Sequence, residues 1–168
     1  MSKIHPHDKA ELANLRHAVQ ALIHSKVKAG SKASVMADLN GHRESFMRIP
    51  WDQDRRTENW HWSTLFGLVD GAGGTVTCNL WNIEDRPEAV LYQMAKTQQI
   101  YGGVGLLELF QIHRIERGVS IEKFGKRLGI VKSVVPKLES ADDPRLGTLY
   151  RLARALDGQL FLGVGSVQ

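Results

Sequence analysis

Side chains that could carry out catalysis or bind a metal are few in this sequence, and they are scattered. The single cysteine, Cys78, lies in the strand-like run TVTCNLW, where a small buried residue is a better interpretation than a nucleophile. One cysteine also excludes an intrachain disulfide and any zinc site built on paired cysteines. His5 and His7 stand in a polar N-terminal segment and are too sparse for a catalytic metal site.

Other signatures of a reaction site are also missing from the sequence. It contains no Gly-rich phosphate loop, no carboxylate pair on one helix face and no His-x-x-x-His motif. His61 is flanked by tryptophans and is expected to be packed, whereas His113 is expected at the surface of a helix. We therefore expect no enzyme, no metal site and no cofactor.

Four tryptophans could either pack in a core or stack on nucleobases. They are Trp51, Trp60, Trp62 and Trp81. Packing is favoured, because base stacking is expected on a flat basic β-surface that this sequence does not indicate. Trp60 and Trp62 are two residues apart and cannot share one helix face, so at least one should be partly exposed or lie against a neighbouring element.

Composition and charge set the broad class of protein. The 168 residues are 42% hydrophobic, which is ample for packed cores, and the net charge of +4 is compatible with nucleic acid without proving it. No apolar run approaches the roughly 20 residues of a membrane span, and the start MSKIHPHDKAEL is too polar for a signal peptide. We expect a cytoplasmic protein that does not bind a membrane.

An internal repeat indicates how the chain is organised. Residues 63–80 (STLFGLVDGAGGTVTCNL) align with residues 147–164 (GTLYRLARALDGQLFLGV) without a gap, so that Gly74 meets Gly158. Further upstream, three apolar positions of one half align with three of the other, namely Val35, Leu39 and Ile49 with Phe124, Leu128 and Leu138. The sequence therefore predicts a mainly α protein with two tandem units, over residues 9–82 and 104–166, joined by a connector helix within 83–103.

Each unit is predicted to hold four helices and a closing strand. Capping residues, glycines and apolar spacing delimit these elements, and residues 1–8 are expected to be a frayed tail. The predicted ranges are 9–28, 32–39, 42–49, 58–69 and strand 75–82 in the first unit, and 104–117, 121–128, 132–139, 144–156 and strand 159–164 in the second. The last helix is predicted to start with Asp143 as its cap and Pro144 in its first turn, and Ile115 is assigned to the apolar face of 104–117. A lone closing strand would leave an unpaired edge, so the two strands could pair within the chain as an internal pseudo-dimer.

The segment LGIVKSVVPKLESADDPRLGTLYRLARALDGQLFLGV (residues 128–164) resembles the XRE, or lambda-repressor-like, helix-turn-helix family. It is most similar to the antitoxin-like branch, in which the domain closes with a β-strand. The most specific features are the turn at Gly129, the pair Leu138-Glu139 and the run DPRLGTL. The resemblance extends over residues 104–164 and, more weakly, over residues 10–80.

The resemblance implies that the third helix of each unit enters the major groove and reads bases. In the first unit, this implies base contacts from His42, Arg43, Glu44, Met47 and Arg48, with Arg43 the best candidate for bidentate contact with guanine. In the second unit, the corresponding positions hold Val131, Lys132, Ser133, Pro136 and Lys137.

Basic residues elsewhere could contact phosphates or be ordinary solvated charges, and the loop pair Arg55-Arg56 could also contact the minor groove. They lie at helix starts, on the helix before the reading helix, or in the loop after it. The candidates are Lys32, Arg55, Arg56, Lys123, Lys126, Arg127 and Arg145.

The two units depart from the family pattern in different ways. Pro136 falls inside the predicted third helix of the second unit, where it removes a backbone hydrogen bond and can kink the helix. The first unit has Met36 in place of Gly125 and Pro50 in place of Glu139. Valines leave the second reading helix poor in donors, so the first unit is favoured as the reader of bases.

The resemblance implies a sequence-specific transcription regulator, most simply a repressor, whose partner is a double-stranded DNA operator. Two unlike reading helices predict an asymmetric or pseudo-palindromic operator. The chain could act as a monomeric pseudo-dimer or as a homodimer. The alternative is an antitoxin that neutralises a toxin partner and represses its own operon.

Overall fold

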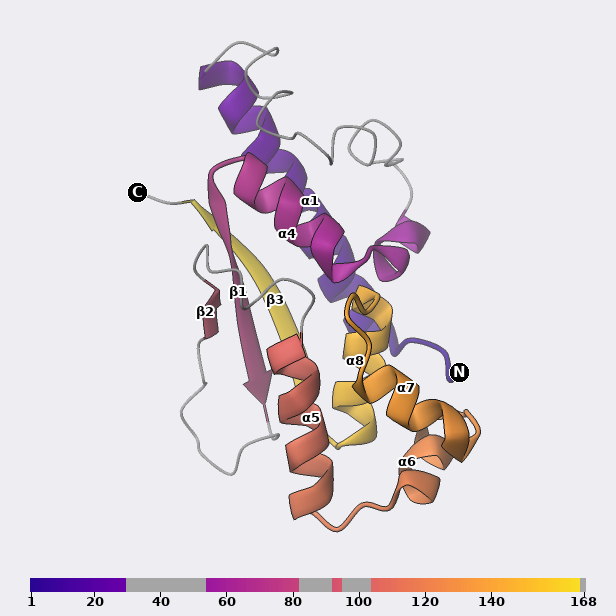
Figure 1. Cartoon of the computed structure of the whole chain (residues 1–168). Helices are drawn as coiled ribbons and strands as arrows, with labels where there is room; N and C mark the ends of the chain where they lie inside the picture. Colours follow the sequence, from indigo (N-terminus) through magenta and orange to yellow (C-terminus); the bar gives the residue numbers. More distant parts are fainter. Residues whose placement is uncertain (30–53, 82–91, 95–103, 167–168) are drawn as a thin grey trace.

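The computed structural model of the chain describes residues 1–29, 54–81, 92–94 and 104–166 (Figure 1). This part of the protein is mainly helical, as predicted. The elements in chain order are α1 (Pro6–Ala29), the 3-10 helix η1 (Asp54–Asn59), α4 (Trp62–Gly71), β1 (Gly74–Trp81), β2 (Tyr92–Met94), α5 (Val104–Glu116), α6 (Ile121–Leu128), the 3-10 helix η3 (Lys132–Val134), α7 (Val135–Glu139), α8 (Leu146–Ala155) and β3 (Gln159–Ser166).

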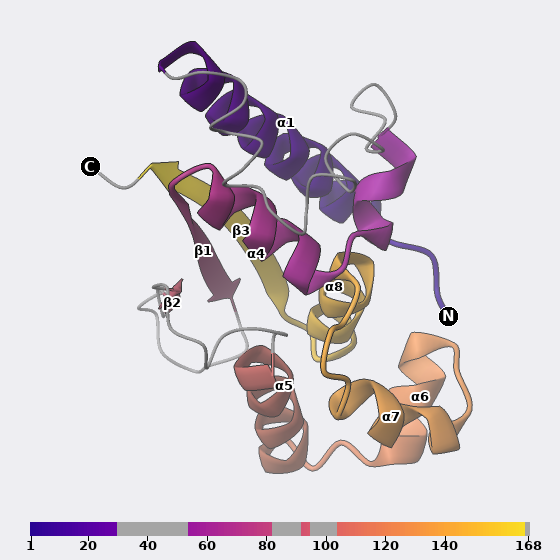
Figure 2. The same cartoon turned by 45° about the horizontal axis from the view of Figure 1, so that its top comes forward.

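The two strands that close the repeated segments pair with each other, as the sequence suggested. β1 and β3 are antiparallel from Gly74 opposite Ser166 to Trp81 opposite Gln159. Helices α1 and α8 contact β3, while α4 contacts β1. Figures 1 and 2 show α1 and α4 at one end of this two-stranded ribbon and α5 to α8 at the other.

The pairing brings together residues that the repeat equates. Cys78 lies opposite Leu162, and these two residues occupy the same position in the gapless alignment of the two segments. Helices α4 and α8 also begin and end at aligned positions, since Trp62 aligns with Leu146 and Gly71 with Ala155. The pair of α4 and β1 and the pair of α8 and β3 therefore occupy equivalent places on either side of the centre of the ribbon.

A second contact between the halves also joins residues at aligned positions. His61 and Arg145, the residues before α4 and α8, form an isolated antiparallel β-bridge. The amide of Trp62 donates to the carbonyl of Pro144 at 2.9 Å, and the amide of Leu146 donates to the carbonyl of Trp60 at 2.8 Å. Each helix thus has one of its free N-terminal amides satisfied by the chain that precedes the other helix.

The prediction of one connector helix within residues 83–103 is wrong at Tyr92–Met94. These three residues form β2, which pairs antiparallel with β1 and gives the strand order β2-β1-β3. An edge strand exposes a row of unpaired backbone amides and carbonyls, and β2 covers part of that row on β1. The helical apolar spacing of the segment did not reveal this partner. The rest of the connector lies outside the described residues.

The first eight residues are not the frayed tail that the sequence suggested. Helix α1 already begins at Pro6, a residue well suited to the first turn of a helix. Ile4 and Asp8 are buried, and the amide of Ser2 donates to the carbonyl of Leu128 at 2.7 Å. We call residues 1–8 the N-terminal strap, because they fasten the first half of the chain to the second.

The described residues share one hydrophobic core, to which both halves contribute. Its largest fully buried side chains are those of Trp62, Tyr150, Phe110, Phe124, Leu12, Leu15, Ile23, Leu65, Leu68 and Leu107. Trp60 is buried as well, because it precedes α4 instead of lying on it, so the two tryptophans need not share a helix face. Neither of them is available for base stacking, which agrees with the packing interpretation.

Candidate nucleic-acid interface

Helix α6 begins and ends where its sequence predicts. The hydroxyl of Ser120 accepts a hydrogen bond from the amide of Lys123 at 3.1 Å, which caps the first turn. At the other end Gly129 has φ of +68°, in the left-handed region that favours glycine. The chain therefore leaves α6 sharply and turns toward the next helix.

Gly125 lets the turn pack closely on α6. A Cβ atom at this position would lie 3.0 Å from the carbonyl oxygen of Ile130 and 3.3 Å from a methyl carbon of Val135. Val135 is itself fully buried, so its methyl group and the carbonyl of Ile130 have little room to move away from an added Cβ atom. The close approach fixes how the third helix of the motif is presented.

The third helix is divided into two parts. Lys132–Val134 form the 3-10 turn η3, and α7 continues from Val135 to Glu139. Pro136 stands in the first turn of α7, where its nitrogen would have no partner inside the helix. The predicted loss of a hydrogen bond inside a continuous helix is therefore wrong, because the change of helix type places the proline at a helix start.

All five positions that the resemblance assigned to base reading in this unit are exposed. Val131 is 66% exposed, and the others are Lys132, Ser133, Pro136 and Lys137. In contrast, Val135 and Glu139 on the opposite side of the same short helix are buried. One side of the motif is thus held by the core, while a hydroxyl, two ammonium groups and two apolar groups are presented to solvent.

A buried ion pair holds α7 against α5. The guanidinium of Arg114 donates from Nε to Oε1 of Glu139 and from Nη2 to Oε2, the latter at 3.1 Å. Its Nη1 donates to the carbonyl of Val119 at 3.0 Å, and the guanidinium carbon lies 6.0 Å from the ring centre of Phe124. Sequence reasoning singled out Leu138-Glu139 but missed Arg114. The signal was available, since a glutamate at a buried helix position needs a cationic partner.

Two other predictions for α5 are wrong. His113 is buried, although it was expected at the surface, and Ile115 is 61% exposed, although it was assigned to the apolar face. Helix α5 must direct Arg114 inward to meet Glu139. That orientation carries the neighbouring Ile115 outward and His113 inward.

The basic residues proposed as phosphate contacts differ in their surroundings. Lys123 and Lys126 are exposed on α6, and Arg145 is exposed at the start of α8. Arg127 is partly engaged within the protein, because its Nη1 donates to the carbonyl of Ala155 at 2.6 Å and to Oδ2 of Asp157 at 3.1 Å. Arg127 therefore ties α6 to the residues at the end of α8.

The site residues that the sequence predicts for a first unit mostly lie outside the described residues. Arg55 and Arg56 lie on η1, but their side chains are not described. The short helices predicted over 32–39 and 42–49 also lie outside the described residues, together with Lys32, His42, Arg43, Glu44, Met47 and Arg48.

Asp143 was predicted to cap α8, but it caps α4. Its carboxylate accepts from the amide of Ser63 at 2.9 Å and from the hydroxyl of Ser63 at 2.6 Å. The ring Nδ1 of His61 also lies 2.9 Å from the carbonyl of Asp143, which only accepts, so this nitrogen carries the proton. The loop that follows α7 therefore stabilises the start of α4, in the other half of the chain.

Comparison with known families identifies the motif built from these helices. Residues 111–161 match the family model described as Helix-turn-helix. Over this segment, which is less than half of the chain, the protein is similar to helix-turn-helix domains of the XRE type. No curated protein and no solved structure matches the chain.

The match indicates a DNA-binding transcription regulator, because this family consists of DNA-binding regulatory domains. It begins within α5 and ends within β3, so it takes in α6, the turn at Gly129, η3, α7 and α8. Among the described residues, no helix is long and apolar enough to cross a membrane.

Proposed function

We propose that this protein is a sequence-specific repressor of transcription in which two unlike helix-turn-helix units of one chain act as an internal pseudo-dimer. The observation that carries the proposal is the helix-turn-helix of residues 111–161, whose third helix presents Lys132, Ser133 and Lys137 to solvent. Lysine ammonium and serine hydroxyl groups suit contacts with base edges and phosphates.

The reciprocal contacts between the halves support the pseudo-dimer. The ribbon is centred on the aligned pair Cys78 and Leu162, and the β-bridge joins the aligned pair His61 and Arg145. In symmetric regulators, two helix-turn-helix units related by a two-fold axis read half-sites about one helical turn apart, roughly 34 Å. We propose the same geometry for the two units of this chain.

The operator is proposed to be asymmetric or pseudo-palindromic. The two reading segments, HRESFMRI and VKSVVPKL, differ at every position assigned to base contact. Arg43 of the first segment is proposed as the strongest base contact, because a guanidinium can donate two hydrogen bonds to one guanine. The two half-sites should therefore differ in sequence and in how strictly that sequence is required.

Selection of bound duplexes from a random pool, followed by measuring the mass of the complex on the best site, tests this proposal. We expect one chain bound to one asymmetric site. A palindrome bound by two chains would contradict the internal pseudo-dimer, because it would mean that only one unit of each chain reads DNA. Absence of any selected sequence would contradict sequence-specific binding itself.

An antitoxin that also represses its own operon is the second candidate. The observation that favours it is the strand that closes the helix-turn-helix unit, a feature of the antitoxin-like branch that the sequence resembles. Purification of the full chain from its native host distinguishes the two. A small basic protein bound at a fixed stoichiometry, and toxic when expressed alone, would support the antitoxin. Purification of the chain with DNA-binding activity and no such protein would support the simple repressor.

A further inference from the structure

A cavity of about 390 Å³ lies between the N-terminal strap and the second half of the chain. The strap contributes one wall, and the ends of α6 and α8 contribute the other. The lining residues are Ser2, Lys3, His5, Asp8, Arg127, Arg151, Arg154, Ala155 and Asp157. The volume falls within the range of about 300–1,000 Å³ that is usual for small-molecule sites.

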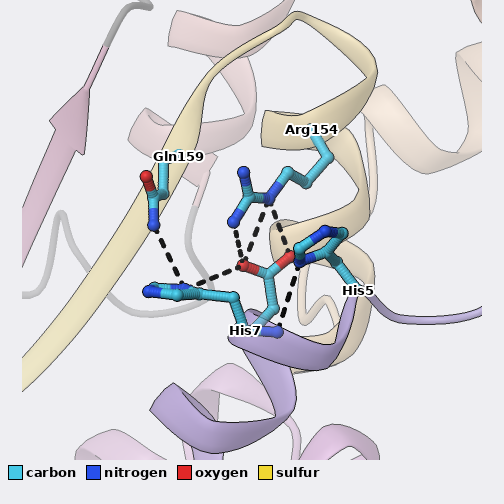
Figure 3. A network of polar contacts seen from close by, with 5 residues as sticks. His5, His7, Arg154 and Gln159 are labelled. Carbon is cyan, nitrogen blue, oxygen red and sulfur yellow. Dashed lines mark hydrogen bonds and ion pairs between the residues drawn. The ribbon is translucent and has the colours of Figure 1, made fainter.

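Positive charge dominates this lining. Lys3, Arg127, Arg151 and Arg154 are cationic, and two carboxylates, those of Asp8 and Asp157, oppose them. Asp8 is buried and is occupied by Arg154, which donates to it at 2.8, 3.0 and 3.2 Å. Figure 3 shows this network where Arg154, His5 and His7 meet at the beginning of α1. Asp157 is 73% exposed, so solvent weakens its effect on the cavity.

The guanidinium groups of Arg127, Arg151 and Arg154 keep donors that the described part of the chain does not use. Arg154 engages Asp8 through Nε and Nη2, and Arg127 makes its described hydrogen bonds through Nη1 alone. The Nε of Arg151 is buried without a hydrogen-bond partner among the described residues, and its Nη2 forms a long ion pair with Oε2 of Glu58 at 3.9 Å. Guanidinium donors that the protein leaves unused can be taken up by a bound oxyanion.

We propose that this cavity binds a small, multiply charged oxyanion, of the phosphate or polycarboxylate class, and thereby fastens the N-terminal strap to the helix-turn-helix unit. Guanidinium groups donate pairs of parallel hydrogen bonds to such anions, and Lys3 adds a point charge from the opposite wall. An anion held between Lys3 on one side and Arg127 and Arg151 on the other draws the strap toward α6, the helix that precedes the reading helix. The inference does not depend on DNA binding by the protein.

The proposal is tested on the full chain with sodium pyrophosphate as the probe and sodium chloride at the same ionic strength as the reference. We expect calorimetric titration to show one binding site per chain. We also expect the midpoint of thermal unfolding to rise with pyrophosphate and to follow the saturation of that site, because a ligand bound only to the native state stabilises it.

Two variants remove charge from the cavity, and a third serves as their control. Arg151→Gln and Lys3→Gln should each weaken pyrophosphate binding by about tenfold or more, because each removes a charge-assisted contact. Lys9→Gln removes one positive charge from an exposed position outside the cavity and should bind as the wild type does. Lys3 is exposed on the strap, so the test remains valid even if Arg151→Gln impairs folding.

Equal responses in all four proteins, or a rise in the unfolding midpoint that never saturates, would overturn the proposal. Either result would mean that the anion acts through general screening. Absence of heat and of any shift beyond that of chloride would overturn it as well.

A DNA phosphate has the same chemistry as a free anion, so a further comparison separates these two sources. If a backbone phosphate fills the cavity, random duplex DNA will displace pyrophosphate. Arg151→Gln will then lower by about one the number of counterions released on DNA binding, measured from its salt dependence. If a free small anion fills it, the affinity for pyrophosphate will be the same with and without bound duplex. Failure to bind DNA at all would leave the pyrophosphate titration unaffected.

Discussion

Burial decides which single side chains of this protein can react. The thiol of Cys78 is fully buried in β1, opposite Leu162. Burial raises the pKa of this thiol to about 12, because the thiolate would be poorly solvated there. The same effect raises the pKa of the Tyr150 hydroxyl. The interpretation of Cys78 as a small packed residue, made from its strand-like context, is confirmed by its burial.

The raised pKa of Cys78 should make stability depend on pH in the alkaline range. An unfolded thiol begins to ionise near the ordinary value of 9.0, whereas the folded one stays protonated up to about 12. The stabilisation is complete below pH 9 and is lost as the pH rises through this window. Between pH 9 and 10 this contribution should fall by about 1 kcal/mol. Urea denaturation of the wild type and of Cys78→Ala at both pH values measures it.

Both proteins share every other titrating group. The difference between their losses of unfolding free energy from pH 9 to pH 10 therefore isolates the contribution of the thiol. The range stops at pH 10 because Tyr150 contributes increasingly above it. Identical loss of stability in the two proteins would contradict the proposed role of thiol burial.

Two basic residues should affect DNA binding in different ways. Arg43→Ala should weaken binding to the selected site by about 1–3 kcal/mol and relax the sequence requirement at one position. Lys126→Ala should weaken binding to all duplexes, as expected of a phosphate contact. The number of counterions released on binding, given by the slope of log affinity against log salt concentration, should fall by about one. Affinities measured on the selected and a scrambled duplex, at several salt concentrations, check both. Unchanged specificity of Arg43→Ala would contradict the role proposed for that segment.

At the scale of elements, the buried Arg114–Glu139 pair holds α7, which is part of the third helix of the motif, against α5. Removing one partner leaves a buried charge without compensation, so Arg114→Ala and Glu139→Ala should each reduce the free energy of unfolding by about 3–5 kcal/mol. Chemical denaturation gives these values directly. Glu108→Ala, an exposed glutamate to alanine change on α5, is the matched control and should change stability by less than about 0.5 kcal/mol.

The double replacement Arg114→Met with Glu139→Leu sharpens this test. Apolar side chains of similar volume often replace a buried ion pair with little loss of stability. We expect the double variant to be more stable than either alanine variant. Equal destabilisation of the three proteins would mean that the pair acts through packing more than through charge.

Local signals explain which elements the sequence predicted well. The bounds of α6 were predicted from Ser120 and Gly129, because a capping hydroxyl and a left-handed glycine act within a few residues. β2 and the N-terminal strap were missed because their partners lie far away in the chain. Ser2 contacts Leu128, and Asp8 contacts Arg154, so nothing within residues 1–8 reveals that they are held.

The candidate site was predictable to a similar degree. The exposed positions of the third helix were predicted from a family resemblance, because members of a family keep the same spacing between the residues of a motif. Arg114 was missed because its importance depends on an orientation of α5 that apolar periodicity alone left open. Asp143 was assigned to the wrong helix, since its sequence position does not distinguish a cap within its own half from a cap across to the other half.

At the scale of the whole molecule, close backbone approach joins the two halves. A Cβ atom on Gly147 would lie 2.8 Å from the carbonyl oxygen of Glu58 and 2.9 Å from Ile4. Gly147→Ala should therefore reduce the free energy of unfolding by about 1–3 kcal/mol, as overpacking usually does. Urea denaturation measures the change.

Gly105→Ala is the matched control for this prediction. Gly105 lies near the start of α5, and a Cβ atom there would meet nothing within 4 Å. Alanine at this position should be neutral or stabilise the protein by up to about 1 kcal/mol. A loss of stability equal to that of Gly147→Ala would mean that the contact between the halves contributes little.

The pairing of β1 with β3 within one chain has a consequence for how such a regulator responds to its own abundance. Two identical subunits must first meet before they can occupy a two-part site, so their response steepens with concentration and disappears on dilution. In the proposed pseudo-dimer the two units are synthesised together and stay together at any concentration. Occupancy of the operator should therefore rise in simple proportion at low protein levels. In the same proposal each reading segment is encoded separately, so a substitution in one segment leaves the other unchanged.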